Sequence, residues 1–203
     1  MSRIDEAAAE ALAGNLIVLP TDTVYGIGTR PDLPDATRKL FEAKERPRDL
    51  TLPVLVPSAE DAARVAEVDD RARHLMERFW PGPLTIVLRR TAPSREWDLG
   101  ADRDTIGLRR PRHLLTLAVL ERTGPLAVTS ANLSDRPTPS ACEELVALFG
   151  DRVSVYLCQQ EPVAGAPSTV VDLAGDDARV LRRGAIPEDD VLAELGRAPS
   201  GGP

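Results

Sequence analysis

Short apolar runs recur along the chain, and polar or amphipathic stretches separate each run from the next. A short apolar run between turn-forming residues is typical of a buried strand, whereas apolar residues repeating every three or four positions are typical of a helix. The apolar runs predict strands at residues 16–19, 52–56, 84–88, 105–108, 126–128, 153–157, 169–173 and 179–181. The amphipathic stretches predict helices at residues 2–13, 34–44, 70–79, 112–122, 141–149 and 188–195, with one more helix beginning at Ser58.

Residues near the ends of these helices support the predicted limits. Gly14 suits the position just after a helix, where the backbone often needs a positive φ. Ser58 with Asp61, and Ser140 with Glu143, have the spacing at which a hydroxyl and a carboxylate cap a first helical turn.

The order of the elements predicts the fold class. Some of the predicted strands are joined through helices and others are not, which indicates an α/β protein with a mixed parallel and antiparallel sheet. Residues 20–28 are rich in turn formers and hydroxyls, so Gly26 and Gly28 are interpreted as turn residues, and residues 91–103 as a polar loop. We expect one domain over residues 1–195 and a disordered tail over residues 196–203.

Composition and charge narrow the class of protein. The 203 residues are 42% hydrophobic and 28% charged, which is ordinary for a globular protein. The formal net charge of −7 disfavours sequence-independent binding to nucleic acid. No apolar run is long enough for a membrane span, and the charged first residues do not resemble a secretory signal, so we expect a cytoplasmic protein. In a reducing cytosol, Cys142 and Cys158 are interpreted as buried, reduced residues.

Several common kinds of site are excluded by the sequence. It has no P-loop motif, and the third glycine of a dinucleotide fingerprint is missing after Gly28. The only histidines, His74 and His113, have no cysteine or histidine cluster near them, which disfavours a zinc site. Ser130 lacks the flanking glycines of a hydrolase nucleophile elbow. Residues 188–190 are acidic, as is usual for the first turn of a helix.

Polar side chains gather where predicted strands and helices end, which is where binding residues concentrate. Hydroxyls and arginines dominate these stretches, and such groups hold phosphate and carboxylate ligands. Each stretch alone is also compatible with an ordinary turn or a helix cap. The stretches are residues 20–26, residues 44–48, residues 129–134 with 136–138, and the scattered set Thr105, Arg109, Ser168, Thr169, Arg182 and Arg183.

These stretches together resemble the YrdC/TsaC family of threonylcarbamoyl-AMP synthases, in its single-domain form. The similar segments are LPTDTVYGIG at 19–28, KERP at 44–47, FWPGPLT at 79–85, TSANLS at 129–134, STVVD at 168–172 and RRGAI at 182–186. Their order and spacing match over roughly residues 5–195, nearly the whole chain. The resemblance implies a twisted mixed sheet flanked by helices, with a large basic cavity.

The same resemblance implies a reaction and its participants. A nucleotidyltransferase of this family forms threonylcarbamoyl-AMP and pyrophosphate from L-threonine, bicarbonate and ATP with Mg²⁺, for N6-threonylcarbamoylation of adenosine 37 in tRNA. The implied partners are tRNA and other proteins of that modification pathway, with no membrane and no protein-bound metal site. Two alternatives stay open at this point: a carbamoyl-adenylate-forming domain, and a non-catalytic RNA-binding module.

Residue roles follow from the same match. The matched catalytic positions are Lys44, Arg46, Ser130 and Asn132. The matched ATP positions are Arg46, Thr105, Ser130, Thr138 and Arg182, and the matched threonine positions are Thr23, Arg109 and Ser168.

Other positions fall outside this match. Many family members carry an asparagine and a histidine near the positions of Leu50 and Leu55, and this chain does not. We expect Arg89 and Arg90, which match no ligand position, to be surface arginines.

Overall fold

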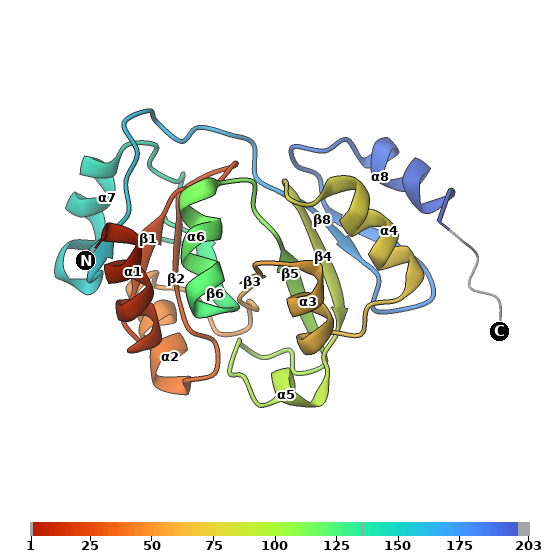
Figure 1. Ribbon diagram of the computed structural model, residues 1–203, viewed down its shortest axis with the longest axis horizontal. Coiled ribbons are helices and arrows are strands. Elements are labelled where there is room, and N and C mark those ends of the chain that lie inside the picture. The colour runs from red at the N-terminus through yellow and green to blue at the C-terminus, as the bar shows by residue number, and fades with distance from the viewer. Residues whose placement is uncertain (1, 135, 199–203) are drawn as a thin grey trace.

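The computed structural model describes residues 2–134 and 136–198, and the predicted tail falls partly on residues 199–203, outside the described part. Within the described part, nine strands form one sheet in the order β7-β1-β2-β6-β3-β5-β4-β8-β9 (Figure 1). The strands are β1 (Ile17–Leu19), β2 (Gly26–Thr29), β3 (Val54–Leu55), β4 (Leu84–Arg89), β5 (Thr105–Arg109), β6 (Leu126–Ser130), β7 (Val155–Tyr156), β8 (Thr169–Asp172) and β9 (Arg179–Arg182). The helices are α1 (Arg3–Leu12), α2 (Pro34–Ala43), α3 (Ala59–Val65), α4 (Asp70–Phe79), α5 (Ala92–Arg95), α6 (Leu114–Thr123), α7 (Cys142–Phe149) and α8 (Glu188–Leu195), with a 3₁₀ turn at Gly150–Arg152.

The sheet is mixed, as the sequence predicts. Parallel pairing joins β1 to β7, β3 to β5 and β4 to β8, and the other neighbours are antiparallel. Ser58 caps α3 by accepting a hydrogen bond from the Asp61 backbone N–H, so that predicted cap is confirmed. The cap predicted at Ser140 is wrong: α7 begins one residue later, and the Ala141 N–H donates to the Glu144 carboxylate.

The interpretation of Gly26 and Gly28 as turn residues is also wrong, because both lie in β2 between β1 and β6. A Cβ atom at either position would lie 2.6 Å from a methyl group of Val128. The two glycines are therefore required by the close packing of β2 on β6. Because glycine is generally depleted in strands, the sequence pattern hides this element.

Two apolar cores form on opposite faces of the sheet. Because side chains alternate along a strand, β1 sends Ile17 and Leu19 into one core and Val18 into the other. The smaller core lies under α1 and α6, which lie side by side over β1, β2 and β6 (Figure 1). The larger core packs against α2, α3, α4, α7 and α8.

Arg90 is completely buried, so its expected place on the surface is wrong. Its guanidinium donates to the backbone carbonyls of Thr105, Ser94, Trp97 and Asp102. Arg90 therefore closes the predicted polar loop 91–103 onto the sheet, and that loop also contains the short helix α5.

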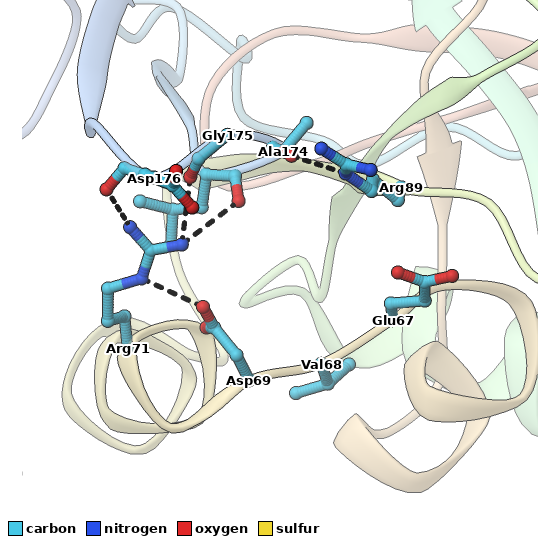
Figure 2. Close-up of a pocket in the computed structure, with 9 residues that line it drawn as sticks. Glu67, Val68, Asp69, Arg71, Arg89, Ala174, Gly175 and Asp176 are labelled. Carbon is cyan, nitrogen blue, oxygen red and sulfur yellow. Dashed lines mark hydrogen bonds and ion pairs between the residues drawn. The ribbon is translucent and has the colours of Figure 1, made fainter. Parts of the chain in front are cut away.

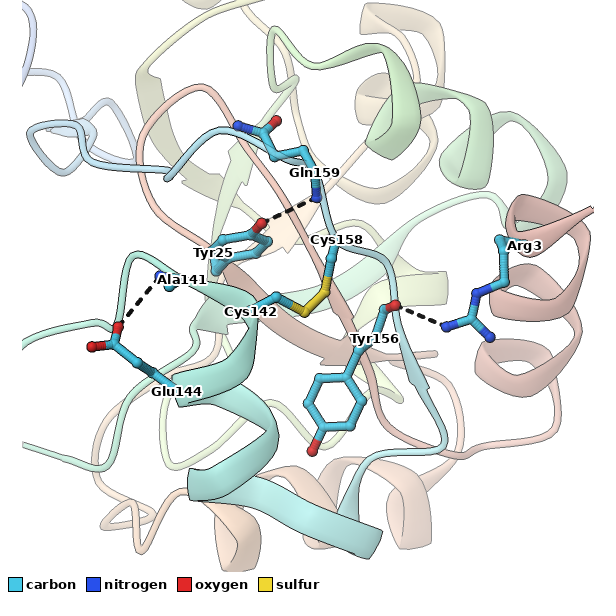
Figure 3. The surroundings of a disulfide bond; sticks show 8 residues. All are labelled: Arg3, Tyr25, Ala141, Cys142, Glu144, Tyr156, Cys158 and Gln159. Atoms are coloured by element: carbon cyan, nitrogen blue, oxygen red, sulfur yellow. Dashed lines mark hydrogen bonds between the residues drawn. A yellow bond between two sulfur atoms is a disulfide. The ribbon is translucent and has the colours of Figure 1, made fainter.

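The two cysteines form a disulfide, Cys142–Cys158, which contradicts their interpretation as buried, reduced residues (Figure 3). Their Cα atoms are 5.8 Å apart, within the range that a disulfide spans. The bond ties the first turn of α7 to the segment after β7, and both residues are half-buried. Beside it, the Gln159 N–H donates to the Tyr25 hydroxyl (Figure 3).

The helices of the described part are all too short or too polar to cross a lipid bilayer.

Candidate functional site

A cavity of about 740 Å³ opens on one face of the sheet. Helices α1 and α6 cover another part of the same face. Its floor consists of alternate residues of the central strands, because side chains two apart share one face of a strand. It is lined by Thr21, Thr23–Gly26, Arg46, Thr51–Pro53, Leu55, Thr85, Val87, Asp102, Thr105, Gly107, Arg109, Val128–Ser130, Arg136–Thr138, Gly165, Pro167, Ser168, Val170, Leu181 and Arg182.

The charge of this cavity is positive. Four arginines line it, Arg46, Arg109, Arg136 and Arg182, against one carboxylate, Asp102. Asp102 is already engaged, because it accepts hydrogen bonds from the Thr105 hydroxyl and from two backbone N–H groups. The cavity is therefore suited to ligands that carry several negative charges.

Arg109 and the β1–β2 loop form one hydrogen-bonded network at the cavity wall. The Arg109 guanidinium donates to Asp22 Oδ1 at 2.5 Å, to Thr23 Oγ1 at 2.9 Å and to the Gly82 carbonyl at 3.1 Å. Burial lowers the pKa of Arg109, and Asp22 opposes that effect. The network leaves the guanidinium charged and fixed at the cavity surface.

Ser168 and Arg182 form a second contact at the cavity floor. Arg182 donates to both the carbonyl and the hydroxyl of Ser168, each at 2.9 Å from Nη2. The Ser168 hydroxyl also contacts the Thr85 hydroxyl at 2.8 Å. Burial lowers the pKa of Arg182. This contact joins β4, β8 and β9 at the point where they meet the cavity.

Lys44 lies behind the cavity wall. Only 1% of its surface is exposed, and its ammonium group lies 2.5 Å from the Ser130 carbonyl, 2.5 Å from the Asn132 carbonyl and 3.2 Å from Asn132 Oδ1. Burial, together with repulsion from Arg46, lowers the pKa of Lys44 to about 7. Lys44 thus fixes the loop after β6 that presents Ser130 to the cavity.

Arg46 faces the cavity because the backbone turns sharply between it and Lys44. Glu45 has a φ of 51°, a left-handed conformation that is uncommon outside glycine. Within the described residues the Arg46 side chain makes one hydrogen bond, from Nη2 to the Thr51 carbonyl at 3.1 Å, and its Nε is buried without a partner. Burial lowers the pKa of Arg46, whereas the charge of Asp49 raises it.

Eight of the ten residues predicted for the site line this one cavity. They are Thr23, Arg46, Thr105, Arg109, Ser130, Thr138, Ser168 and Arg182. The other two, Lys44 and Asn132, lie beside it and contact Ser130, whose hydroxyl donates to Asn132 Oδ1 at 2.5 Å.

Sequence reasoning missed three polar residues that line the cavity. Thr85 belongs to the FWPGPLT segment and so lay within a recognised motif, whereas Thr51 lies between the KERP and FWPGPLT segments. Asp102 lies in the polar loop 91–103, where nothing in the sequence marks it.

A second cavity, of about 460 Å³, lies between the start of α4 and the β8–β9 turn (Figure 2). Its two arginines are already paired: Arg71 donates to Asp69 and to carbonyls of residues 173, 175 and 176, and Arg89 donates to the Ala174 carbonyl. This cavity is therefore held together by its own groups and offers little to a charged ligand.

Comparisons with known proteins find similarity over most of the chain. The sequence model of the Sua5/YciO/YrdC family, described as telomere recombination, matches residues 10–184. A putative threonylcarbamoyl-AMP synthase of Mycobacterium tuberculosis is 42% identical over 194 residues, which is 95% of this chain and 89% of that protein.

Two solved structures are similar over most of the chain. Pyrococcus abyssi Sua5 complexed with L-threonine has a TM-score of 0.86 and 32% identity, over 96% of this chain and 58% of that one. Escherichia coli YciO has a TM-score of 0.80 and 28% identity, over 90% of this chain and 89% of that one.

Proposed function

The chain belongs to the Sua5/YciO/YrdC family, and from this premise we propose that its large cavity is the active site of a threonylcarbamoyl-AMP synthase. The synthase function follows from relatives that carry this name over nearly the whole chain. It makes the protein a transferase of tRNA threonylcarbamoyladenosine modification. The observation that carries the assignment to the cavity is the meeting there of four arginines with a row of hydroxyl side chains.

The proposed substrates are L-threonine, bicarbonate and ATP. The threonine amine forms a carbamate with bicarbonate and releases water. A carbamate oxygen then attacks the α-phosphate of ATP, and pyrophosphate leaves. The chief obstacle is repulsion among a carboxylate, a carbamate and a triphosphate. Fixed cations and hydroxyl donors lower this barrier by holding the groups in place and by stabilising the charge that develops at phosphorus.

Two sets of cavity residues divide these tasks. Arg109, Thr23 and Ser168 are proposed to hold threonine, where a guanidinium suits the carboxylate and the hydroxyls suit its polar groups. The nucleotide is proposed to contact Arg46, Thr105, Ser130, Thr138 and Arg182. Lys44 and Asn132 support Ser130 through the contacts described above.

A resident metal site does not fit the described residues. They contain no cluster of three or more metal-ligating side chains, and Asp102 is already hydrogen-bonded through both oxygens. We propose that Mg²⁺ enters as part of the ATP substrate, which agrees with its usual binding through phosphates and few protein groups.

The adenylation step is proposed to need no tRNA. The net charge of −7 leaves only local patches to attract RNA, and any such affinity is expected to fall steeply with salt. Transfer to tRNA then belongs to other proteins of the modification pathway.

The direct test is mass detection of threonylcarbamoyl-AMP made by the purified protein, with pyrophosphate release measured in parallel. We expect both signals only when threonine, bicarbonate and ATP are all present, and we expect them without tRNA. Leaving out threonine or bicarbonate one at a time is the matched control. Pyrophosphate release that is independent of threonine would contradict the proposal, and an absolute requirement for tRNA would contradict its order of steps.

A further inference from the structure

Asp22 lies behind the cavity wall and contacts the guanidinium that reaches the cavity. It belongs to the β1–β2 loop, and Arg109 ends β5. Their side chains are 13% and 9% exposed, and Asp22 Oδ1 lies 2.5 Å from Arg109 Nη2. Arg109 lines the cavity, whereas Asp22 does not. Any effect of the Asp22 carboxylate on a bound ligand is therefore transmitted through Arg109.

The carboxylate is itself held in place. The same Oδ1 accepts a hydrogen bond from the Arg112 backbone N–H at 2.9 Å, just after β5. Asp22 Oδ2 is buried and has no hydrogen-bond partner among the described residues. Oδ1 thus carries both bonds and couples the β1–β2 loop to the end of β5.

The two hydroxyls of the same loop are engaged to different degrees. The Thr21 hydroxyl donates to the Val24 carbonyl at 2.6 Å, so its single proton is used. Its oxygen also accepts from the backbone N–H groups of Thr23 at 3.1 Å and Val24 at 3.3 Å, which uses both lone pairs. The Thr23 hydroxyl accepts from Arg109 Nη1 at 2.9 Å. Thr23 therefore keeps one lone pair for a ligand in the cavity.

We propose that Asp22 is a positioning residue for threonine: by holding one arm of Arg109, it directs the other arm onto Thr23 and so sets both groups for the amino acid. This inference rests on the proposed function. A threonine carboxylate would bind the remaining N–H groups of Arg109. A donor on the amino acid, its amine or its hydroxyl, would bind the free lone pair of Thr23.

The test compares steady-state kinetics of Asp22→Asn and Asp22→Ala with the unchanged protein. Asparagine keeps an acceptor for Arg109 and for the Arg112 N–H but removes the charge, and charged hydrogen bonds are roughly twice as strong as neutral ones. We expect the KM for threonine to rise about 10- to 100-fold in Asp22→Ala and less in Asp22→Asn. We expect the KM for ATP to change less than about 2-fold.

Asp32→Asn is the matched control. Arg30 and Asp32 form a two-bonded pair, with both distances 2.7 Å, away from the cavity. Asp32→Asn therefore removes the charge of an arginine–aspartate pair without changing a residue of the cavity, so the KM for threonine is expected to stay unchanged. An equal rise in this control would overturn the proposal.

A double variant separates positioning from a general loss of structure. Asp22→Ala leaves the buried Arg109 without its charged partner, which is expected to destabilise the fold. The double variant Asp22→Ala/Arg109→Ala removes both charges. If Asp22 acts through Arg109, the double variant has the same KM for threonine as Arg109→Ala alone. A further rise in the double variant, or an unchanged KM in a folded Asp22→Asn, overturns the inference. Absence of product from the unchanged protein would instead contradict the proposed function.

Discussion

The sharpest prediction concerns Arg46, which differs from Arg109 and Arg182 of the same cavity in having few partners. Arg109 and Arg182 are each anchored by at least three hydrogen bonds, but Arg46 makes one among the described residues. A guanidinium has five N–H donors, so most of those of Arg46 are left for a ligand. We expect Arg46 to bind the nucleotide at the phosphate where the carbamate attacks.

The size of the effect follows from that geometry. Removing a preorganised cation from the position where charge develops costs about 2–4 kcal/mol of transition-state stabilisation, or roughly 30- to 1000-fold in rate. Arg46→Ala should therefore reduce turnover by that factor. Its effect on stability should be small, because the side chain gives up only its bond to the Thr51 carbonyl. Arg46→Lys should restore little, since a point charge cannot replace a planar fork.

The assay is pyrophosphate release at saturating threonine and bicarbonate, with thermal melting to show that each variant is folded. Arg89→Ala is the control, because Arg89 is exposed, lies outside the large cavity and bonds only to the Ala174 carbonyl within the described residues. We expect its turnover to stay within about 2-fold of the unchanged protein. Equal turnover of folded Arg46→Ala and Arg89→Ala would refute the placement of Arg46 in the site.

Four further predictions follow from other contacts. Arg182→Ala should also reduce turnover severely, whereas Arg109→Ala should mainly raise the threonine concentration needed for half-maximal rate, as read from initial rates at varied threonine. Threonine should be strongly preferred over valine and 2-aminobutyrate, because the hydrogen-bonding groups of the site would be left unpaired; equal rates in competition would contradict this. Arg90→Ala should lower the free energy of unfolding in urea by about 3–5 kcal/mol, because four carbonyls around a buried side chain lose their donor, and no loss would show that the loop closes without it. The double variant Cys142→Ser/Cys158→Ser should lower the free energy of unfolding by about 3 kcal/mol, or roughly 6–12 °C in Tm. Reduction of the disulfide in the unchanged protein should lower the Tm by the same amount.

The sequence predicts this fold well where the local pattern and the tertiary environment agree. Helix α4 lies at the predicted residues 70–79, because its polar N-cap and its apolar face both favour that span. The pattern fails for β2, whose glycines are poor strand formers but are required by the closeness of Val128. Close packing between strands that are distant in the chain cannot be inferred from their composition.

Buried charges and cross-links escaped prediction for a related reason. Arg90 directly follows the exposed Arg89 in the sequence, and nothing local distinguishes the two residues. Their difference arises because the chain bends back after β4, which brings the carbonyls of residues 94–105 around the Arg90 side chain. Likewise, Cys142 and Cys158 are 16 residues apart, and only the packing of α7 against the segment after β7 brings them together.

The sequence predicts which residues meet at the large cavity but not how their side chains are arranged there. Lys44 and Arg46 belong to one short motif, yet the left-handed backbone at Glu45 sends their side chains in different directions. The ammonium group of Lys44 lies among two carbonyls and an amide oxygen, whereas the guanidinium of Arg46 at the cavity makes one hydrogen bond to the described residues. Because a buried ammonium with three close acceptors has little left to offer a phosphate, we propose that Lys44 serves the reaction by fixing the loop that carries Ser130. On this proposal the two cations of the motif act at different distances from the substrate, one in contact with it and one through the protein.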